Sequence, residues 1–452
     1  MFDYAIIGGG VVGSAIFNKL TRKGKKCVLL EKELDLGEGA TKANSGLVHA
    51  GFDAESGTLK AKFNKRGNEM IKTLARELRI AYNQTGALVV GNDIEKLKNL
   101  KLRGKNNGIK GLKIIKDEEL FRLVPNLSKD IKYALHAKTA GVISPFMLNI
   151  ALAEEAVLNG GEFRLGFELK YAIYEKKHYT LYSENNSVCA KNVINCAGSC
   201  FNEVSKILGV EQKELQFRRG EYIVLDKCDF VNLTVFPLPT LLGKGILATP
   251  TIDGNILLGP TAEDVQDYDT STTQEGIDKI LNHIKSYFTN VPLYKNIRQF
   301  SGIRVSAGKD FVVEKSKINN RVVLVAGINS PGLTSAPAIA EYVAEELYGE
   351  VQPDKEMQRR KPYTSREKGK IVCRCEHIGE NEIINAINAP IPAQTVDAIK
   401  RRTRAGFGRC QGGQCLLDVT RLIAKYQGVQ MHEVCKSSKN SFICFEGGNY
   451  EN

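Results

Sequence analysis

The sequence predicts an α/β plus α+β fold, in which a nucleotide-binding domain is interleaved with an antiparallel sheet and followed by a small cysteine-rich domain. A glycine-rich turn joins a strand to a helix within residues 2–23. Short alternating stretches, separated by Gly and Pro turns, fill 81–140 and 216–302. Six of the eleven cysteines fall after residue 370. The length of 452 residues suits two or three domains of about 150 residues each.

Composition and charge describe a globular chain with a basic surplus. Hydrophobic residues make up 42% and charged residues 25%, which argues against a disordered or fibrous chain. The formal net charge of +12 suits nucleic acid, a membrane surface or another acidic partner. The basic run at 400–404 has no aromatic interleaving and no binding motif, so we expect no nucleic acid.

The sequence also predicts where the protein is found. The chain opens directly on a strand and shows no signal peptide, and its cysteines do not suggest a secreted disulfide framework. No apolar run approaches the roughly 18 residues that a membrane span needs. We therefore expect a cytoplasmic protein, whose contact with a membrane would be peripheral.

The first forty residues form the pattern of a dinucleotide-binding unit. A strand, a helix, a second strand and an acidic residue follow one another at 2–7, 12–23, 27–30 and Glu31. Gly8 permits a tight turn, Gly10 lets the backbone approach a pyrophosphate, and Gly13 lets the helix pack on the sheet. Glu31 would accept hydrogen bonds from ribose hydroxyls. The pattern does not distinguish FAD from NAD.

Longer runs carry a resemblance to a known family. They are NSGLVHAGFDAESGTLKAKFNKRGN (44–68), TGALVVG (85–91), GVISPFMLNIALAEEA (141–156), VINCAGS (193–199), RRGEYIVLDK (218–227), KGILATPTIDGNILLGPTAEDV (244–265), FSGIRVSAGKDFVVE (300–314) and AGINSPGLTSAPAIAEYV (326–343). In this order they resemble the D-amino-acid-oxidase-like flavoproteins, in the group of glycerol-3-phosphate dehydrogenases and L-2-hydroxyglutarate oxidases. The resemblance covers nearly all of residues 1–350.

The resemblance implies a Rossmann-like FAD-binding domain interleaved with an antiparallel-sheet substrate domain that roofs the flavin. We expect the FAD-binding domain at 1–80, 141–215 and 303–352, and the substrate domain at 81–140 and 216–302.

The matched segments predict which residues surround FAD. Small and hydroxyl residues at 39–53 would line a groove, and a strand at 193–196 ends in two small residues beside the adenosine half. A strand at 322–326 leads to a helix from about Ala336, whose positive N-terminus would stabilise a reduced flavin. Besides the glycines and Glu31, the predicted contacts are Lys32, Thr41, Asn44, Ser45, Gly46, Ala197, Gly198, Gly332, Leu333 and Thr334.

Three residues are candidates for binding an anionic substrate. Arg304 matches the family position whose guanidinium holds a carboxylate or phosphate, although Val305 stands where relatives often have Pro. Lys309 would add the second positive charge that a phosphate dianion needs. Tyr222 would either donate a hydrogen bond at the pocket edge or pack within its strand.

His49 is the candidate for proton transfer. A pocket histidine, with an ordinary pKa of about 6.5, can take the hydroxyl proton as hydride leaves the carbon. In relatives, a histidine in this region contacts the flavin, sometimes covalently, or the substrate. The alternative is a core histidine bonded to backbone. The sequence does not decide whether FAD is covalently attached.

Four cysteines predict a metal centre after residue 370. Cys373 and Cys375 follow a short strand, and Cys410 and Cys415 follow 34 residues later. Thiolate pairs at this spacing can chelate one iron each in a [2Fe–2S] cluster, whereas structural zinc prefers C-x2–4-C pairs. The stretches VCRCEHIGENEIINAI and TRAGFGRCQGGQCLLDVTRLIA resemble the bacterioferritin-associated-ferredoxin-like [2Fe–2S] domain.

We therefore expect a cluster domain at 371–452, joined by a polar linker at 353–370. Glycines in the cluster segment would aim backbone N–H groups at the sulfurs, and a helix at 416–426 would pack over the site. Five arginines flank the cysteines, and we expect them to compensate the cluster charge and attract an acidic partner: Arg374, Arg401, Arg402, Arg404 and Arg409.

Together these features predict an FAD-dependent dehydrogenase. The preferred substrate is sn-glycerol 3-phosphate, oxidised to dihydroxyacetone phosphate, with electrons leaving through the cluster to a partner protein. The resemblance implies a second flavoprotein subunit as that partner. L-2-hydroxyglutarate or another 2-hydroxy acid is the second choice, and an amino acid or opine the third. A non-catalytic electron carrier or redox sensor would keep both cofactors, but His49, Arg304 and Lys309 favour catalysis.

Overall fold

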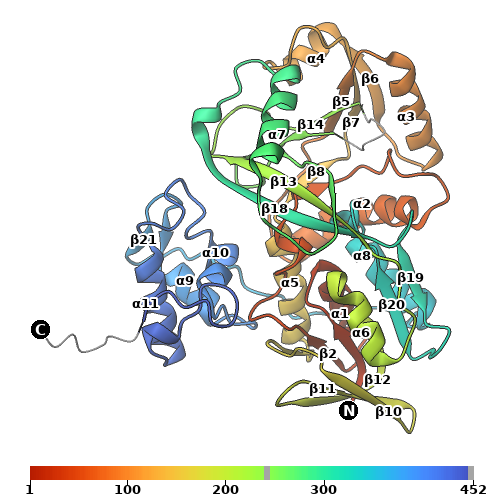
Figure 1. Ribbon diagram of the computed structural model, residues 1–452, viewed down its shortest axis with the longest axis vertical. Helices are drawn as coiled ribbons and strands as arrows, with labels where there is room; N and C mark the ends of the chain where they lie inside the picture. The colour runs from red at the N-terminus through yellow and green to blue at the C-terminus, as the bar shows by residue number, and fades with distance from the viewer. Residues whose placement is uncertain (239–244, 446–452) are drawn as a thin grey trace, which may run out of the picture.

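Two large sheets form the body of the protein, and the C-terminal domain lies beside them in the computed structural model (Figure 1). The structure describes residues 1–238 and 245–445. Two predicted segments extend beyond the described residues: the run quoted at 244–265 begins at residue 244, and the predicted cluster domain includes residues 446–452. Among the described helices, none is both long and apolar enough to cross a membrane.

The first sheet is built on the predicted dinucleotide-binding unit. Its eight strands are β1 (Phe2–Ile7), β2 (Cys27–Leu30), β9 (Glu162–Arg164), β10 (Tyr171–Glu175), β11 (His178–Tyr182), β12 (Ser187–Asn195), β19 (Val312–Lys315) and β20 (Val322–Ala326). Strand β1 pairs in parallel with β2 and β12, and β12 pairs in parallel with β20. This parallel centre confirms the predicted Rossmann-like domain.

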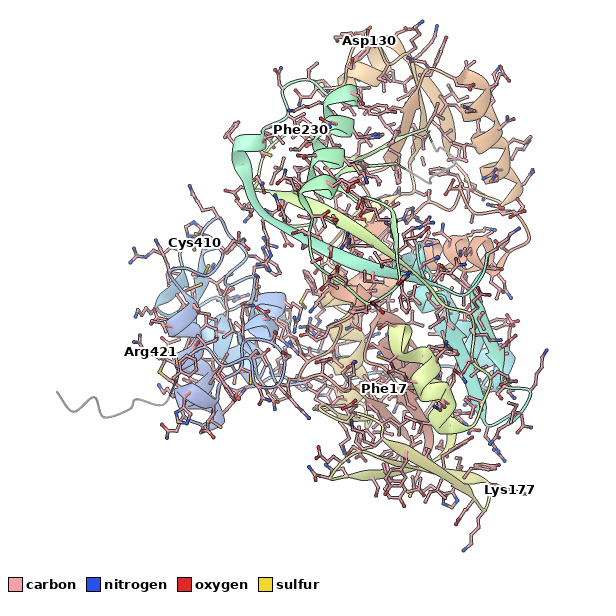
Figure 2. All side chains as sticks on the ribbon, in the orientation of Figure 1. Phe17, Asp130, Lys177, Phe230, Cys410 and Arg421 are labelled. Atoms are coloured by element: carbon pink, nitrogen blue, oxygen red, sulfur yellow. The ribbon has the colours of Figure 1, made fainter. Side chains whose placement is uncertain are left out.

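Helices cover both faces of this sheet. One face packs on α1 (Val11–Arg22), α2 (Leu59–Glu77), α5 (Pro145–Leu158) and α8 (Gly332–Tyr342), and the other on α6 (Phe201–Leu208). Tyr4 and Ile6 of β1 face the α1 side, whereas Ala5 faces the α6 side, because successive strand residues point to opposite faces. Phe17 of α1 is fully buried in the core between the sheet and the four helices on the α1 side (Figure 2).

Helix α8 begins earlier than the sequence predicted. It starts at Gly332, four residues before the expected start near Ala336. A helix that started near Ala336 would have Pro337 in its first turn, where proline loses no hydrogen bond. The structure instead holds Pro337 inside the helix, so Gly332, Leu333 and Thr334 form its first turn.

The second sheet has nine strands. They are β5 (Ala87–Gly91), β6 (Leu112–Lys116), β7 (Tyr133–Ala137), β13 (Gln216–Leu225), β14 (Thr234–Pro237), β15 (Leu247–Pro250), β16 (Ile256–Gly259), β17 (Glu263–Val265) and β18 (Asn296–Ser306). The pairings of these strands are antiparallel except for β5 with β14. The predicted antiparallel-sheet domain is therefore confirmed, with β18 continuing past the boundary expected at 302.

Three helices pack on the second sheet, and a small sheet lies beside the two large ones. The helices are α3 (Ile94–Asn106), α4 (Asp117–Leu123) and α7 (Gln274–Tyr287), and the small sheet joins β3 (Leu47–Val48), β4 (Tyr82–Asn83) and β8 (Gly141–Ile143). Short helical turns are η1 (Ala40–Lys42), η2 (Gly198–Cys200), η3 (Leu293–Lys295), η4 (Val343–Leu347) and η5 (Met431–Glu433).

The C-terminal domain is a small helical unit with its own core. It contains β21 (Ile371–Cys373), β22 (Ile378–Gly379), α9 (Glu380–Ile387), α10 (Val396–Thr403) and α11 (Leu416–Gln427). Its core includes Ile150 of α5, so the domain packs directly on the FAD-binding domain. Helix α11 begins at Leu416, where the sequence predicted a helix.

Residues 353–370 connect the domains without regular structure but are anchored on α5. Arg360 is almost fully buried, and its Nε donates to Glu154 Oε2 at 2.9 Å. Tyr363 donates its hydroxyl to Glu154 Oε1 at 2.6 Å. The segment predicted as a polar linker is therefore held against the FAD-binding domain by buried contacts. Its polar composition reflects ion pairs made across the domain junction as well as exposure to solvent.

Candidate functional site

A long cleft runs between the two large sheets. Its volume is about 1710 Å³, above the roughly 300–1,000 Å³ of pockets for drug-sized ligands. The glycine turn after β1, the end of β12 and the start of α8 line one wall, while β13 and β18 line the other. The carboxyl ends of parallel strands meet at this cleft, where open α/β sheets bind their ligands. The space is large enough for a dinucleotide.

The glycine turn brings the backbone close to the site of a pyrophosphate. Gly8 has a φ of +108°, and a Cβ there would lie 2.5 Å from the Cys196 carbonyl oxygen. A Cβ on Gly13 would lie 2.0 Å from the Gly8 carbonyl oxygen, so α1 packs on the turn only with glycine there. Gly10 is the N-cap residue of α1. The N-terminus of this helix carries roughly half a positive charge, which favours an anionic phosphate.

Glu31 and Lys32 line the cleft after β2. Glu31 Oε2 accepts the Gly9 N–H at 2.7 Å, and its Oε1 accepts the Glu33 N–H at 3.0 Å. Burial raises the pKa of Glu31, against the effect of these two hydrogen bonds. A carboxylate oxygen has a second lone pair, so each can still accept a ribose hydroxyl. Lys32 Nζ lies 3.5 Å from Cys200 Sγ.

The loop after β2 is shaped by its own side chains. Thr41 Oγ1 accepts the first N–H of α1 at 3.0 Å. Asn44 Nδ2 donates to the Thr41 carbonyl at 2.8 Å, and its Oδ1 accepts the Gly46 N–H at 2.9 Å. Thr41, Asn44 and Ser45 line the cleft, but Gly46 does not. Gly46 has a φ of +67°, and a Cβ there would lie 2.5 Å from the Ile143 carbonyl oxygen, so its role is in packing.

His49 is held at the cleft through its backbone. Its N–H donates to Thr334 Oγ1 at 2.9 Å, and its carbonyl accepts from Asn68 Nδ2 at 3.0 Å. Ser330 Oγ lies 3.3 Å from His49 Nε2. Thr334 is fully buried and does not line the cleft, so its hydroxyl positions His49 and does not face a cofactor. His49 itself lines the cleft.

Arg304 presents its guanidinium to the cleft from β18. A Cβ on Gly220, in the neighbouring strand, would lie 2.7 Å from Arg304 Nη2, so this glycine leaves room for the guanidinium. Nη2 donates to the Thr261 carbonyl at 2.5 Å. Burial is the largest of the effects that lower the pKa of Arg304, with the Arg218 charge acting in the same direction. Among the described side chains, no carboxylate forms an ion pair with Arg304, although the Asp264 charge acts on it from farther away.

Tyr222 borders the cleft, whereas Lys309 lies outside its lining. Tyr222 lines the cleft and stacks on Phe300, with ring centroids 4.8 Å apart, so it packs in its strand and also borders the pocket. Lys309 is exposed and outside the cleft lining, and its carbonyl accepts from Lys60 Nζ at 2.9 Å. The turn after β18 therefore carries Lys309 away from the substrate position predicted for it. Lys60, which the sequence reasoning missed, lines the cleft.

The remaining predicted residues meet in this one cleft. They are Gly8, Gly10, Gly13, Glu31, Lys32, Thr41, Asn44, Ser45, His49, Ala197, Gly198, Tyr222, Arg304, Gly332 and Leu333. Ser330 was missed because it stands 281 positions from His49, and no local pattern links the two residues.

The four cluster cysteines come together from two segments. Cys373 lies near Cys415, and Cys375 near Cys410, so that the two thiols of each pair shift each other's pKa. Each of these neighbouring pairs takes one thiol from each motif. Among residues 1–238 and 245–445, no three His, Cys, Asp or Glu side chains gather as a single metal ion would need. A two-iron cluster can use two pairs of thiolates.

Backbone N–H groups face these sulfurs, as the glycines in the segment predicted. The Cys415 thiol and the N–H groups of Gly406 and Glu376 lower the pKa of Cys373 to about 5, although burial acts in the opposite direction. The N–H groups of Gln414 and Gly412 lower the pKa of Cys410. Donors aimed at sulfur stabilise thiolates, so the segment suits an iron–sulfur cluster.

The arginines near the cysteines divide into two groups. Arg374 and Arg409 are exposed beside the cluster cysteines, as expected. Arg401, Arg402 and Arg404 instead form ion pairs at the domain junction, with Asp35 for the first two and with Asp253 and Glu376 for the third. The prediction that all five serve the cluster charge and a partner is therefore wrong for Arg401 and Arg402, which are buried.

Comparison with known proteins identifies both parts of the chain. The family described as FAD dependent oxidoreductase matches residues 3–346. This chain belongs to that family. A second family, described as BFD-like [2Fe-2S] binding domain, matches residues 371–425 of this chain. The cofactors of this protein are FAD and a [2Fe–2S] cluster. The glycine turn and the volume of the cleft fit FAD, and the N–H groups around the cysteines fit the cluster.

Relatives of this FAD-dependent oxidoreductase include dehydrogenases and an oxidase. It is 40% identical to the glycerol 3-phosphate dehydrogenase of Caloramator mitchellensis, with 98% of each chain covered. It is 26% identical to the mitochondrial L-2-hydroxyglutarate dehydrogenase of Homo sapiens, over 76% of this chain and 88% of that protein. A dithionite-reduced L-α-glycerophosphate oxidase from Mycoplasma pneumoniae with FAD bound superposes with a TM-score of 0.73 at 27% identity, covering 79% of this chain and 96% of that one.

Proposed function

We propose that the protein is a dehydrogenase that oxidises sn-glycerol 3-phosphate to dihydroxyacetone phosphate. The observation that carries the proposal is the Arg304 guanidinium, which lines the cleft without an ion-paired carboxylate among the described residues. An anionic group on the substrate would supply the missing partner, since a guanidinium binds phosphate or carboxylate oxygens. The full-length similarity to a protein named for glycerol 3-phosphate favours the phosphate.

The side chains divide the work of the oxidation. Arg304 holds the anionic group and so fixes the position of the secondary alcohol. When bound in the cleft, FAD would supply a hydride acceptor, and a [2Fe–2S] cluster held by the four cysteines would supply a one-electron carrier. His49 accepts the hydroxyl proton, which lets the carbon–oxygen bond become a carbonyl. Thr334 and Asn68 hold the His49 backbone, and Ser330 lies against its Nε2, so the imidazole is kept in place.

We also propose that the electrons leave the protein near Cys375 and Cys410. These two thiols are more exposed than Cys373 and Cys415, and Figure 2 shows Cys410 toward the edge of the C-terminal domain. The exposed Arg374 and Arg409 would attract an acidic redox protein or a second flavoprotein subunit. None of the cysteines in residues 1–238 and 245–445 forms a disulfide, which supports a reducing compartment such as the cytoplasm.

The test is an anaerobic titration of the oxidised holoenzyme with glycerol 3-phosphate, L-2-hydroxyglutarate and glycine, while flavin absorbance is recorded. We expect bleaching with glycerol 3-phosphate and not with the other two. Bleaching by L-2-hydroxyglutarate alone would replace the proposed substrate. An oxidised flavin after all three additions would favour an electron carrier or sensor.

A further inference from the structure

Asp35 lies at the centre of a buried ion-pair network between the FAD-binding domain and the cluster domain. Arg402 donates to both of its carboxylate oxygens, with Nη2 to Oδ1 at 2.8 Å and Nη1 to Oδ2 at 2.9 Å. Arg401 Nη2 donates to Asp35 Oδ2 at 2.7 Å and also to Glu38 Oε1. Asp35 is fully buried, and both arginines are buried as well. Burial raises the pKa of Asp35, but the Arg402 and Arg401 charges outweigh it and lower the pKa to about 2.

The carboxylates of this network belong to the loop that lines the FAD cleft. Two residues after Asp35, the Gly37 N–H donates to the Gly9 carbonyl in the glycine turn at 3.0 Å. Glu38 lines the cleft, and Thr41 accepts the first N–H of α1. Residues 38–41 therefore line the FAD site, and Asp35 lies three residues before them in the same loop, so a displacement of Asp35 would be passed on to the lining.

The two arginines belong to the segment that leads into the cluster loop. They lie in the last turn of α10, and Cys410 and Cys415 follow in the next twelve residues after Thr403. Arg404, with a φ of +73°, directs the chain out of the helix and donates to Glu376 Oε2 at 2.8 Å. Glu376 adjoins Cys375, and Arg404 stands six positions before Cys410, so this contact joins the two segments that carry the cluster cysteines.

We propose that Asp35, Arg401 and Arg402 couple the binding of FAD to the binding of the [2Fe–2S] cluster. With the cluster held, the loop after α10 fixes the last turn of the helix, and the two arginines hold the FAD-site wall through Asp35 and Glu38. The coupling is mutual, because an effect of one ligand on the affinity of another is reciprocal. If the proposed function holds, the coupling also ensures that FAD stays in molecules whose cluster can carry its electrons away.

The experiment measures the dissociation constant of FAD for the full chain by flavin fluorescence. Each protein is measured with its cluster in place and after anaerobic removal of the iron by a chelator. In the natural protein we expect loss of the cluster to weaken FAD binding by about fivefold or more, the range of typical allosteric couplings. Asp35→Asn should bind FAD more weakly, and removal of its cluster should change the affinity little further. No turnover is needed, so the result does not depend on the substrate.

A control variant and a second test variant complete the experiment. Asp397→Asn removes the partner of Lys436, 2.9 Å away, from the first turn of the same helix, and should keep the full effect of the cluster. If Asp35→Asn does not fold, Arg401→Gln tests the same link, because Arg402 still neutralises Asp35 while the contact with Glu38 is lost. Equal FAD affinity of the natural protein with and without its cluster would overturn the proposal. So would an unchanged cluster effect in the folded Asp35 or Arg401 variant.

Discussion

Replacing Arg360 with methionine would leave Glu154 buried without its cation. The two side chains are 1% and 0% exposed, and their closest atoms, Nε and Oε2, are 2.9 Å apart. Tyr363 would remain bonded to Glu154 but carries no charge to balance it. Removing one partner of a buried ion pair costs about 3–5 kcal/mol. Methionine is long and apolar, so the loss reflects the unpaired carboxylate more than an empty space.

The assay is urea unfolding of the Arg360→Met protein, followed by circular dichroism because the chain has no tryptophan. We expect the free energy of unfolding to fall by about 3–5 kcal/mol. The matched control is Arg366→Met, an exposed arginine of the same segment, which should change it by no more than about 0.5 kcal/mol. Adding Glu154→Gln to the Arg360 variant should restore much of the loss. Equal stabilities of the two arginine variants would show that this ion pair does not anchor residues 353–370.

Three further changes test other parts of the structure. Gly13→Ala places a Cβ 2.0 Å from the Gly8 carbonyl oxygen, so the purified protein should lack flavin absorbance; a full complement of FAD would contradict the packing described for α1. Arg304→Ala should raise the substrate dissociation constant about 10–150-fold, because charged hydrogen bonds are worth about 1.5–3 kcal/mol, and should leave FAD affinity unchanged; equal losses for both ligands would count against its role. The pKa of Asp35 is lowered from 3.8 to about 2, so its ionised form should add about 2 kcal/mol to the free energy of unfolding above pH 4. This contribution is lost as the pH falls toward 2. The stability difference between natural and Asp35→Asn protein should therefore shrink in acid, and a constant difference would refute this origin.

The parts of the fold that depend on short stretches of sequence were predictable. Strands β1, β2 and β20 have the expected bounds, because each is an apolar run that ends at glycine or an acidic residue. The glycine turn specifies its own geometry, since side chains at Gly8 and Gly13 would collide with backbone. The cleft residues followed because the resemblance supplied their arrangement around a cofactor.

The contacts between distant segments were not predictable from local patterns. The polar composition of residues 353–370 indicated a linker but not its contacts, since Arg360 finds its carboxylate 206 positions away. Arg401 and Arg402 stand in a basic run that looked exposed, but Asp35 lies 366 and 367 positions from them. Lys309 was assigned by its distance along the chain from Arg304, and the turn between them points it elsewhere. For the three arginines, the carboxylate that each one meets in the fold decides its role, and the residue type alone does not.

The most direct test of the central claim adds glycerol 3-phosphate to the oxidised holoenzyme without oxygen and follows both cofactors in one sample. Flavin absorbance reports the first electron acceptor, and electron paramagnetic resonance reports the reduced cluster. We predict that the flavin bleaches and that the signal of a reduced [2Fe–2S] cluster appears in the same sample. A bleached flavin beside a cluster that stays oxidised would contradict the electron route, and an unbleached flavin would contradict the substrate.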